Sequence, residues 1–292
     1  MSGIYKEIQR YNIFAHILKY DMRQIHRHPM IYYSFINKTT HQLSCDNIKP
    51  FFIILRHVMA KQAAAFLEKI LKKVEELCAS GQYAAALVPL QRAIYLRHLP
   101  SRALMANLLL QGREGIVKNE YRAFELVEEG GRLGCYHCQG VMAYCYWSSC
   151  GILRNNAQSW ELARKSSGNG SRYGQLVLGV LYENGVGGVA QDYSQAVALY
   201  RLAAAQNFDL AQNILGCMYE EGSGVAQDHS EALRLYQLAA AQGLPSALYN
   251  FASCHQHGIG VRKNEAEAIH WYRRAQAAGV SNAAAVLRRL CA

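Results

Sequence analysis

The sequence predicts an all-α fold, a solenoid of antiparallel helix pairs, and three observations support this prediction. First, a unit of about 36 residues recurs along most of the chain. Second, the clearest copies share the order Leu-Gly-x-x-Tyr-Glu, at 178–183 and 215–220, followed by Gly-Val-Ala-Gln-Asp. Third, alanines and tyrosines then recur at intervals of four and three residues, which is the spacing of one helix face. A repeat of this length hides its apolar face only by stacking on its neighbours, so the chain predicts a repeat array.

The composition limits the classes of partner. The chain has 292 residues and a formal net charge of +10, which would suit nucleic acid or an anionic membrane. The first sixty residues, however, are far more basic per residue than the rest, and we find no Lys/Arg run or RNA-binding motif. We therefore expect no nucleic-acid partner. The longest apolar stretch, 51–55, is far too short to cross a bilayer, so we expect no membrane span.

The cysteines and the N-terminus bear on location and assembly. Nine cysteines are an odd number, and they follow no regular pairing along the repeats, unlike those of a secreted disulfide scaffold. The N-terminus also lacks the pattern of a secretory signal. We expect a cytoplasmic monomer, and a mitochondrial location is the alternative because the N-terminal segment is basic.

The part of the chain before the repeats divides into two segments. Residues 1–60 are a poorly defined basic segment outside the repeat pattern. Residues 61–98 predict an N-terminal capping pair, with helices over 62–79 and 82–97 whose apolar residues have helical spacing. Met59 directly precedes this pair, and we hypothesise that the residues upstream of it are dispensable for folding.

Residues 99–280 contain five copies of the repeat in one register. The first helix of each copy carries a small residue where a neighbouring helix is expected to cross, and these residues are Ala106, Ala143, Gly179, Gly216 and Ala252. Their spacing is 36 or 37 residues. Three residues later, a side chain fills the gap between helices; this is Tyr146, Tyr182 or Tyr219, with Leu109 and His255 in the outer copies.

Both ends of the connector between the two helices have recognisable signals. A glycine suited to the left-handed end of the first helix stands at Gly112, Gly185, Gly222 and Gly258, and Ser149 replaces it in the second copy. The second helix has an expected N-cap at Asn119, Asn155, Asp192, Asp228 or Asn264. Its expected core stripe is Ala-x3-Tyr-x2-Ala, at 196–203, 232–239 and 268–275. Residues 281–292 predict a C-terminal capping helix with a polar outer side.

This pattern resembles the Sel-1-like repeat family, a relative of the tetratricopeptide repeat with a longer connector. The segments at 174–206 and 211–242 fit the family pattern nearly completely, 247–278 fits well, and 101–130 and 138–167 depart from it at several positions. The resemblance implies a right-handed α/α superhelix that serves as a non-catalytic adaptor or scaffold for other proteins. It also implies that the first helix of each copy lines the concave side.

The resemblance leaves one alternative function open. Some secreted bacterial members of this family have been described as β-lactamases, so a β-lactamase-like hydrolase or a metal-binding member is the alternative. Those members resemble a variant with regularly paired cysteines, which this chain lacks. The sequence also shows no Ser/His/Asp set, phosphate loop or HExxH motif. We expect no enzymatic activity and no cofactor.

The candidate binding site is the expected concave face, and the expected partner is another protein or a peptide segment. Glu183 and Glu220 recur at matching repeat positions, as side chains that face a groove would. The alternative is a face that is simply solvated. The positions expected to be exposed there are Asn107, Gln111, Tyr144, Trp147, Glu183, Asn184, Asn213, Glu220, Glu221, Tyr249, Gln256 and His257.

One cysteine cluster is a weak candidate for zinc. Its members are Cys135, Cys138, Cys145 and Cys150, and zinc needs four ligands in a tetrahedral arrangement. Cys138, however, stands at a small-residue position of the repeat, which favours burial as a small apolar side chain. A redox role for the Cys135–Cys138 pair is less favoured still, because no βαβ pattern surrounds it. We therefore expect no metal site.

Overall fold

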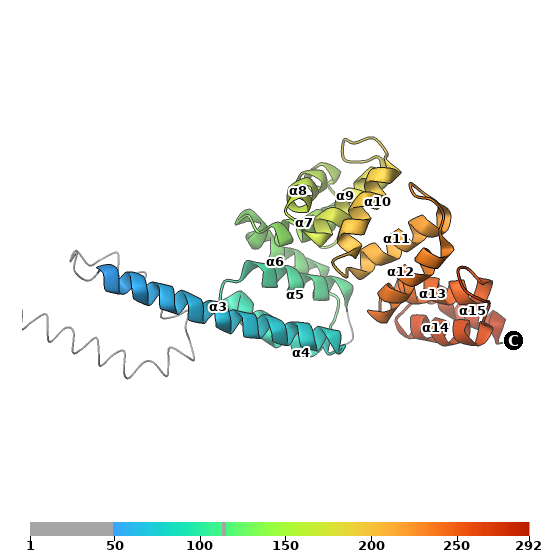
Figure 1. The fold of residues 1–292 in the computed structure, drawn as a ribbon, viewed down its shortest axis with the longest axis horizontal. Coiled ribbons are helices and arrows are strands. Elements are labelled where there is room, and N and C mark those ends of the chain that lie inside the picture. The colour runs from blue at the N-terminus through green and yellow to red at the C-terminus, as the bar shows by residue number, and fades with distance from the viewer. Residues whose placement is uncertain (1–48, 113–114, 292) are drawn as a thin grey trace, which may run out of the picture. The chain divides into compact units, whose positions relative to one another are not determined.

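The computed structural model describes residues 49–112 and 115–291, and every regular element within these ranges is an α-helix (Figure 1). The thirteen described helices are divided between two units, one that ends at His98 and one that begins at Leu99. The predicted all-α class is thus confirmed. The expectations for residues 1–48 lie outside the described residues.

The first unit contains a pair of packed helices, α3 (Lys49–Ala79) and α4 (Tyr83–Tyr95). Val74 of α3 and Leu90 of α4 are buried, and Gly81 turns the chain between the helices with a φ of 75°. We expected the first helix to begin at residue 62, but α3 begins at Lys49. A proline in the first turn of a helix leaves no hydrogen bond unmade, so the proline at position 50 suits this start.

The second unit is a solenoid of five helix pairs with a closing helix, which confirms the predicted architecture. We call the first helix of each pair the A helix and the second the B helix. The pairs are α5 (Leu99–Gln111) with α6 (Glu120–Arg132), α7 (Tyr136–Ser148) with α8 (Asn156–Gly168), α9 (Arg172–Asn184) with α10 (Tyr193–Ala204), α11 (Asp209–Glu221) with α12 (His229–Ala241), and α13 (Pro245–His257) with α14 (Glu265–Ala277). The closing helix is α15 (Ser281–Leu290). Each helix packs on the next along the chain, and α7 also packs on α5 and α9.

The start of every B helix is capped as predicted. The side chain of the N-cap residue accepts a hydrogen bond from a backbone amide in the first turn, at 2.9–3.1 Å. All five expected residues do this: Asn119, Asn155, Asp192, Asp228 and Asn264. Because loss of such a cap typically costs about 1 kcal/mol, these polar residues define where each B helix begins.

The A helices end in the left-handed backbone conformation in all five copies. The four predicted glycines have φ between 58° and 76°, at Gly112, Gly185, Gly222 and Gly258. Ser149 adopts the same conformation with a φ of 61°, so α7 ends as the other A helices do. A residue with a Cβ is strained there, and the second copy therefore makes the same turn at a greater cost in conformational energy.

The predicted core stripe of the B helices is fully buried in the last three copies. Tyr200, Tyr236 and Tyr272 are at most 1% exposed. A Cβ atom placed on Gly179 would lie 2.6 Å from the Tyr200 ring, and one on Gly216 would lie 2.7 Å from the Tyr236 ring. The small residue of the A helix is therefore required by a side chain, the tyrosine ring, rather than by the crossing of a helix backbone.

The second set of tyrosines fills the gap between each A helix and the preceding B helix. Tyr146 of α7 contacts the Phe124 ring of α6 edge-on, with the ring centroids 5.7 Å apart. Tyr182 of α9 contacts the Trp160 ring of α8 in the same way, at 5.6 Å. This confirms that the tyrosine three residues after the small residue fills space between helices.

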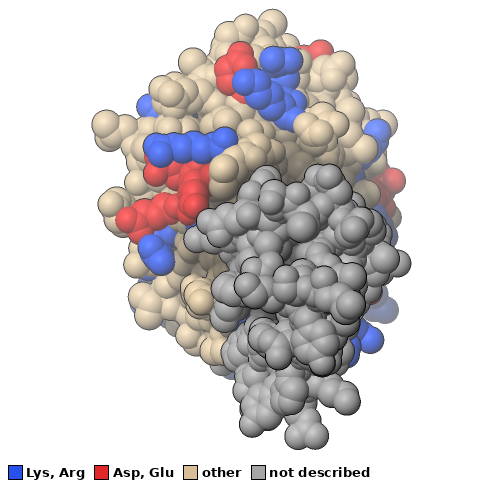
Figure 2. All heavy atoms as spheres, turned by 90° about the vertical axis from the view of Figure 1, so that its left-hand side faces the viewer, with Lys and Arg blue, Asp and Glu red and all other residues tan. Residues whose placement is uncertain are grey.

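Charged side chains of the described residues form mostly local pairs. Examples are Arg132 with Glu128 and Arg234 with Glu231, each within one B helix and at 2.6–2.7 Å. On the face that Figure 2 shows, the positive and negative groups lie next to one another, and most of the described surface there is uncharged. Exposed pairs of this kind contribute at most about 1 kcal/mol each.

Candidate functional site on the A helices

All twelve predicted binding residues lie on A helices, but only three of them are exposed. These are Asn184, Glu221 and His257, the last residues of α9, α11 and α13. They occupy the same position in successive repeats, and we call them the A-helix row. Gln256 is buried, with 9% of its surface exposed, so the expectation that it is exposed is wrong. The other eight are half-buried: Asn107, Gln111, Tyr144, Trp147, Glu183, Asn213, Glu220 and Tyr249.

Three of the predicted residues recur at one repeat position for a structural reason. The Tyr236 hydroxyl donates a hydrogen bond to Glu220 at 2.7 Å, and the Tyr272 hydroxyl donates to Gln256 at 2.8 Å. Tyr200 donates to Glu183 in the same way. A buried hydroxyl without a partner would cost about 1–3 kcal/mol. The recurrence that suggested a groove-facing surface therefore reflects the need of each buried tyrosine for an acceptor.

The environment of these tyrosines keeps them neutral. Burial raises the pKa of Tyr272 to about 12. Burial, together with the nearby Glu183 carboxylate, raises the pKa of Tyr200 well above its ordinary value. Each hydroxyl thus remains a donor across the physiological range, and it holds its glutamate or glutamine in one orientation.

The predicted aromatic residues of α7 belong partly to the core. Tyr144 lies edge-on to Tyr173 of α9, with ring centroids 5.4 Å apart, and it lies 5.9 Å from the Trp147 ring. Both Tyr144 and Trp147 pack on a buried cluster that includes Ala163. Burial raises the pKa of Tyr144 to about 12. Asn107 of α5 accepts a hydrogen bond from the Tyr173 hydroxyl, so it links A helices that are two repeats apart.

Asn213 and Tyr249 are two further half-buried residues of the A helices, and Glu221 is exposed beside them. Asn250 donates to Asn213 at 3.1 Å, which joins α13 to α11, and Tyr249 lies edge-on to Tyr272. Glu221 accepts only a long hydrogen bond of 3.3 Å, from Ser223.

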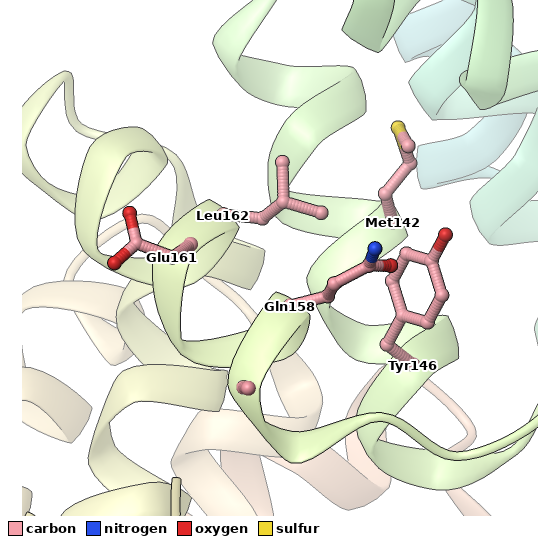
Figure 3. Close-up of a pocket in the computed structure, with 6 residues that line it drawn as sticks. Met142, Tyr146, Gln158, Glu161 and Leu162 are labelled. Carbon is pink, nitrogen blue, oxygen red and sulfur yellow. The ribbon is translucent and has the colours of Figure 1, made fainter. Parts of the chain in front are cut away.

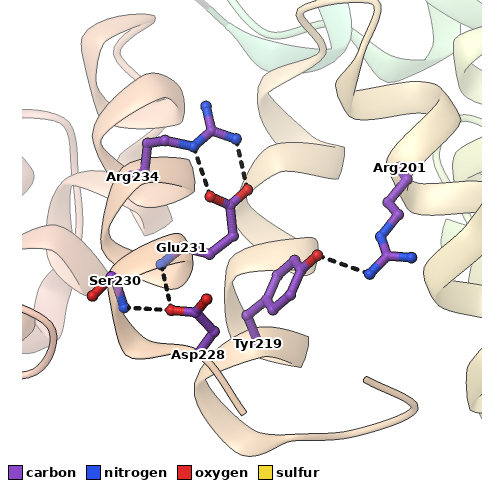
Figure 4. Close-up of polar contacts among 6 residues, drawn as sticks. All are labelled: Arg201, Tyr219, Asp228, Ser230, Glu231 and Arg234. Carbon is purple, nitrogen blue, oxygen red and sulfur yellow. Dashed lines mark hydrogen bonds and ion pairs between the residues drawn. The ribbon is translucent and has the colours of Figure 1, made fainter. Parts of the chain in front are cut away.

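Three carboxylates of α9 and α11, those of Glu183, Glu220 and Glu221, have no cationic partner within the described residues. The arginines of the neighbouring B helices are directed elsewhere (Figure 4). Arg201 donates to the Tyr219 hydroxyl at 2.8 Å, and Arg234 forms a two-pronged pair with Glu231 at 2.7 and 2.8 Å. Among the described residues, Glu183, Glu220 and Glu221 take part in no ion pair. These three side chains can therefore accept further hydrogen bonds from a ligand.

Pockets that border α7 lie away from the predicted residues. One, of about 430 Å³, lies between α7 and α8, where the Gln158 amide lies beside the Tyr146 ring and Glu161 points away (Figure 3). A smaller pocket of about 120 Å³ is lined by the first turns of α5, α7 and α9 and includes His137 and Arg172. Sequence reasoning missed this second pocket because it considered the later turns of the A helices. The repeat register places the first turns of successive A helices at equivalent positions, and it could therefore have indicated this pocket.

The cysteines of the weak zinc candidate are spread along α7 and its ends. Cys135 is the N-cap, Cys138 and Cys145 are fully buried, and Cys150 follows the helix. A Cβ placed on Gly130 would lie 2.5 Å from the Cys138 sulfur, so Cys138 does fill a tight small-residue position. No group of three or more metal-binding side chains is gathered anywhere in the described ranges. Within the same ranges, no helix is long and apolar enough to cross a membrane.

Comparisons with known proteins agree with this geometry. The model of the Sel1 repeat family matches five segments, 100–135, 137–171, 172–208, 209–244 and 245–280. A search of curated proteins finds no match. A Sel1 repeat protein from Oxalobacter formigenes is similar in structure, with 24% identity, a TM-score of 0.51, and coverage of 75% of this chain and 86% of that one.

Two further solved structures are similar at lower scores. A protective antigen of uropathogenic Escherichia coli has 23% identity and a TM-score of 0.49, over 76% of this chain and 50% of that one. The chain thus spans half the length of that antigen. An immunity protein from Pseudomonas aeruginosa has 18% identity and a TM-score of 0.46, over 73% of this chain and 81% of that one. With five matched copies that coincide with the five A/B helix pairs, the chain belongs to the Sel1 repeat family.

Proposed function

We propose that the protein is a non-catalytic adaptor that binds a segment of another protein along the A-helix row and the carboxylates beside it. The observation that carries this proposal is the row itself. Asn184, Glu221 and His257 are exposed at the same position of three successive repeats. A solenoid repeats such positions at regular intervals, which suits an extended peptide or one face of a helix.

The neighbouring glutamates are already held in one orientation before a partner binds. The tyrosine hydroxyls orient Glu183 and Glu220 before any partner arrives. A ligand that binds to oriented side chains loses less conformational entropy than one that must order them. Because these carboxylates have no cationic partner in the described part of the chain, the bound segment is proposed to carry Lys or Arg.

We further propose a cytoplasmic monomer without a nucleic-acid partner, with a mitochondrial location as the alternative. None of the eight described cysteines is in a disulfide, which is usual for proteins in reducing compartments. Size-exclusion chromatography with light scattering tests the monomer, and imaging of the tagged full chain tests the location.

The test of the adaptor function is quantitative affinity capture with mass spectrometry, using the full chain and an A-row variant. The variant combines Asn184→Lys with Glu221→Lys, which reverses the charge of the row. Both residues are exposed, so the melting temperature should stay within about 1–2 °C, as surface changes within about 0.5 kcal/mol imply. We expect the partners captured by the wild type to be lost. Tyr144 and Trp147 are unsuitable for this purpose, because they pack on the core.

The matched control carries the same change of charge on the B helices, Gln237→Lys with Glu161→Lys. Both positions are exposed. Capture should be unchanged in this control. If the control loses the partners while the A-row variant keeps them, the binding face is wrong. Hydrolysis of nitrocefin or bound zinc in the purified protein would instead favour the hydrolase or metal-binding alternative.

A further inference from the structure

Cys135 and Cys138 form a Cys-x-x-Cys pair at the N-terminal end of α7. Cys135 is the N-cap residue and Cys138 lies in the first turn. The first turn of a helix has unpaired backbone amides and the positive end of the helix dipole, and both favour a thiolate. The helix N-terminus thus supplies an environment that favours a thiolate, although the sequence showed no βαβ pattern around the pair.

The two thiols differ in access and in protonation. Cys135 keeps 9% of its surface exposed, whereas Cys138 is fully buried. The neighbouring Cys138 side chain lowers the pKa of Cys135 to about 6, although burial raises it. Interaction with Cys135, together with burial, raises the pKa of Cys138 well above its ordinary value. At neutral pH the less buried sulfur, that of Cys135, is the nucleophile, and the fully buried Cys138 holds the proton.

A cation borders the pair. The Arg102 guanidinium pairs with Glu129 at 2.7 Å, and the Arg102 Nε atom is buried without a hydrogen-bond partner. Gly130 brings the two groups together, because a Cβ placed on it would lie 2.5 Å from the Cys138 sulfur and 3.6 Å from the Arg102 Cδ atom. The positive charge of Arg102 lowers the pKa of Cys138, which opposes the larger effects that raise it. A nearby cation also stabilises the Cys138 sulfur as this sulfur loses its proton in the second step of the reaction.

We propose that Cys135 and Cys138 are a modification site, where a peroxide converts the two thiols into a reversible intrachain disulfide. The Cys135 thiolate attacks one peroxide oxygen, the O–O bond breaks, and a sulfenic acid and hydroxide form. The Cys138 sulfur then attacks the Cys135 sulfur, the S–O bond breaks, and water leaves with the proton of Cys138. The hydroxide takes up the proton that Cys135 released on ionisation, so two thiols lose two electrons and the peroxide is reduced to two waters. This site is independent of the adaptor function.

Oxidation would alter a contact between A helices. The Cys138 thiol now donates to the carbonyl oxygen of Leu99, at the start of α5, over 3.4 Å. A disulfide has no proton to donate, so this bond is lost. The α5–α7 contact therefore depends on the redox state of the pair.

The test treats the reduced full chain with hydrogen peroxide, blocks unreacted thiols by alkylation and maps each cysteine by mass spectrometry. We expect a Cys135–Cys138 disulfide to form before the exposed Cys291 is oxidised, and dithiothreitol to reverse it. In Cys135→Ser the disulfide should be lost and Cys138 should stay reduced. In Cys138→Ala a sulfenic acid should accumulate on Cys135, where dimedone traps it.

Both variants should fold, because the chain already tolerates these residues. Serine is a favoured N-cap, and the repeat has alanine at the position of Cys138 in two later copies, Ala211 and Ala247. The control is Cys254→Ala, which removes another buried cysteine and should leave the disulfide unaffected. Oxidation of Cys291 while the pair stays reduced, or a disulfide that forms only in denaturant, would overturn the proposal.

Discussion

The first two repeats and the last three solve the same packing problem with different residues. In the last three, the B helix contributes a buried tyrosine, and the A helix contributes Glu183, Glu220 or Gln256 to accept a hydrogen bond from its hydroxyl. In the first two, the B helix has Val127 or Ala163 at that position, and the A helix has Leu110 or Trp147. The two positions change together, from a polar pair to an apolar pair.

This difference shows that the buried hydroxyl and its acceptor occur together or are both absent. A buried hydroxyl needs a partner, whereas a valine or alanine needs only apolar atoms around it. Trp147 packs on the cluster that contains Ala163, so a large A-helix side chain compensates for a small B-helix one. A glutamate at position 147 would face no hydroxyl from the B helix of its own repeat.

The A helices of the first three repeats are also joined in a particular way. A Cβ on Gly140 would lie 2.2 Å from the Ser171 hydroxyl oxygen and 2.9 Å from the Gly174 nitrogen. The start of α9 therefore lies directly against α7, which leaves no room for a side chain at Gly140. The bond between Tyr173 and Asn107 extends this contact to α5.

The largest expected effect comes from removing a tyrosine ring, and it tests whether the last three repeats depend on these rings. Tyr236→Ala should destabilise the second unit by about 3–5 kcal/mol, because it removes a large, fully buried side chain. Val127→Ala, at the matching position of the first repeat, should cost only about 2 kcal/mol. Urea unfolding followed by circular dichroism measures both. Equal losses would mean that the two kinds of packing are energetically equivalent.

A smaller effect should distinguish the charged acceptor from the neutral one. Tyr236→Phe removes a hydrogen bond to a carboxylate, and we expect a loss of about 1.5–3 kcal/mol. Tyr272→Phe removes a hydrogen bond to the Gln256 amide, and we expect a loss of about 1 kcal/mol. A double-mutant cycle of Tyr236→Phe with Glu220→Gln measures the coupling directly. Additive losses would contradict the assignment of Glu220 as the acceptor.

The smallest effect concerns the turn that differs in the second repeat. Ser149→Gly should stabilise the protein by about 1 kcal/mol, since glycine adopts a φ of 61° without strain. The reverse change in a regular repeat, Gly185→Ser, should destabilise by a similar amount. The melting temperatures of the two variants and of the wild type test both predictions. A Ser149→Gly protein that melts lower would show that the serine side chain stabilises this turn.

Much of the fold could be predicted from short-range rules. The five N-caps and the left-handed ends of the A helices follow from residues within a few positions of each other. The buried Ala and Tyr stripe follows from the helical period. The start of α3 was misplaced because residues 49–61 have no repeat signature, although nothing in 51–61 interrupts a helix.

The candidate site was harder to predict, because exposure depends on neighbours in other helices. Glu183 and Glu221 differ by one position in the repeat, yet one is held by a buried hydroxyl and the other is exposed. Gln256 looked like a surface amide and is buried against Tyr272. No spacing rule within one helix separates these cases.

The sequence by itself determined the repeat register, the helix ends and the apolar stripe, because each depends on interactions within one turn or one helix face. Only the tertiary structure decided which hydroxyl meets which acceptor, how Asn107 reaches Tyr173, and that Cys138 is fully buried at a helix N-terminus while Cys135 keeps a small exposed surface. These features arise where helices from different repeats come into contact. Their energies depend on burial and on a partner that is distant in the chain, and a single helix contains neither.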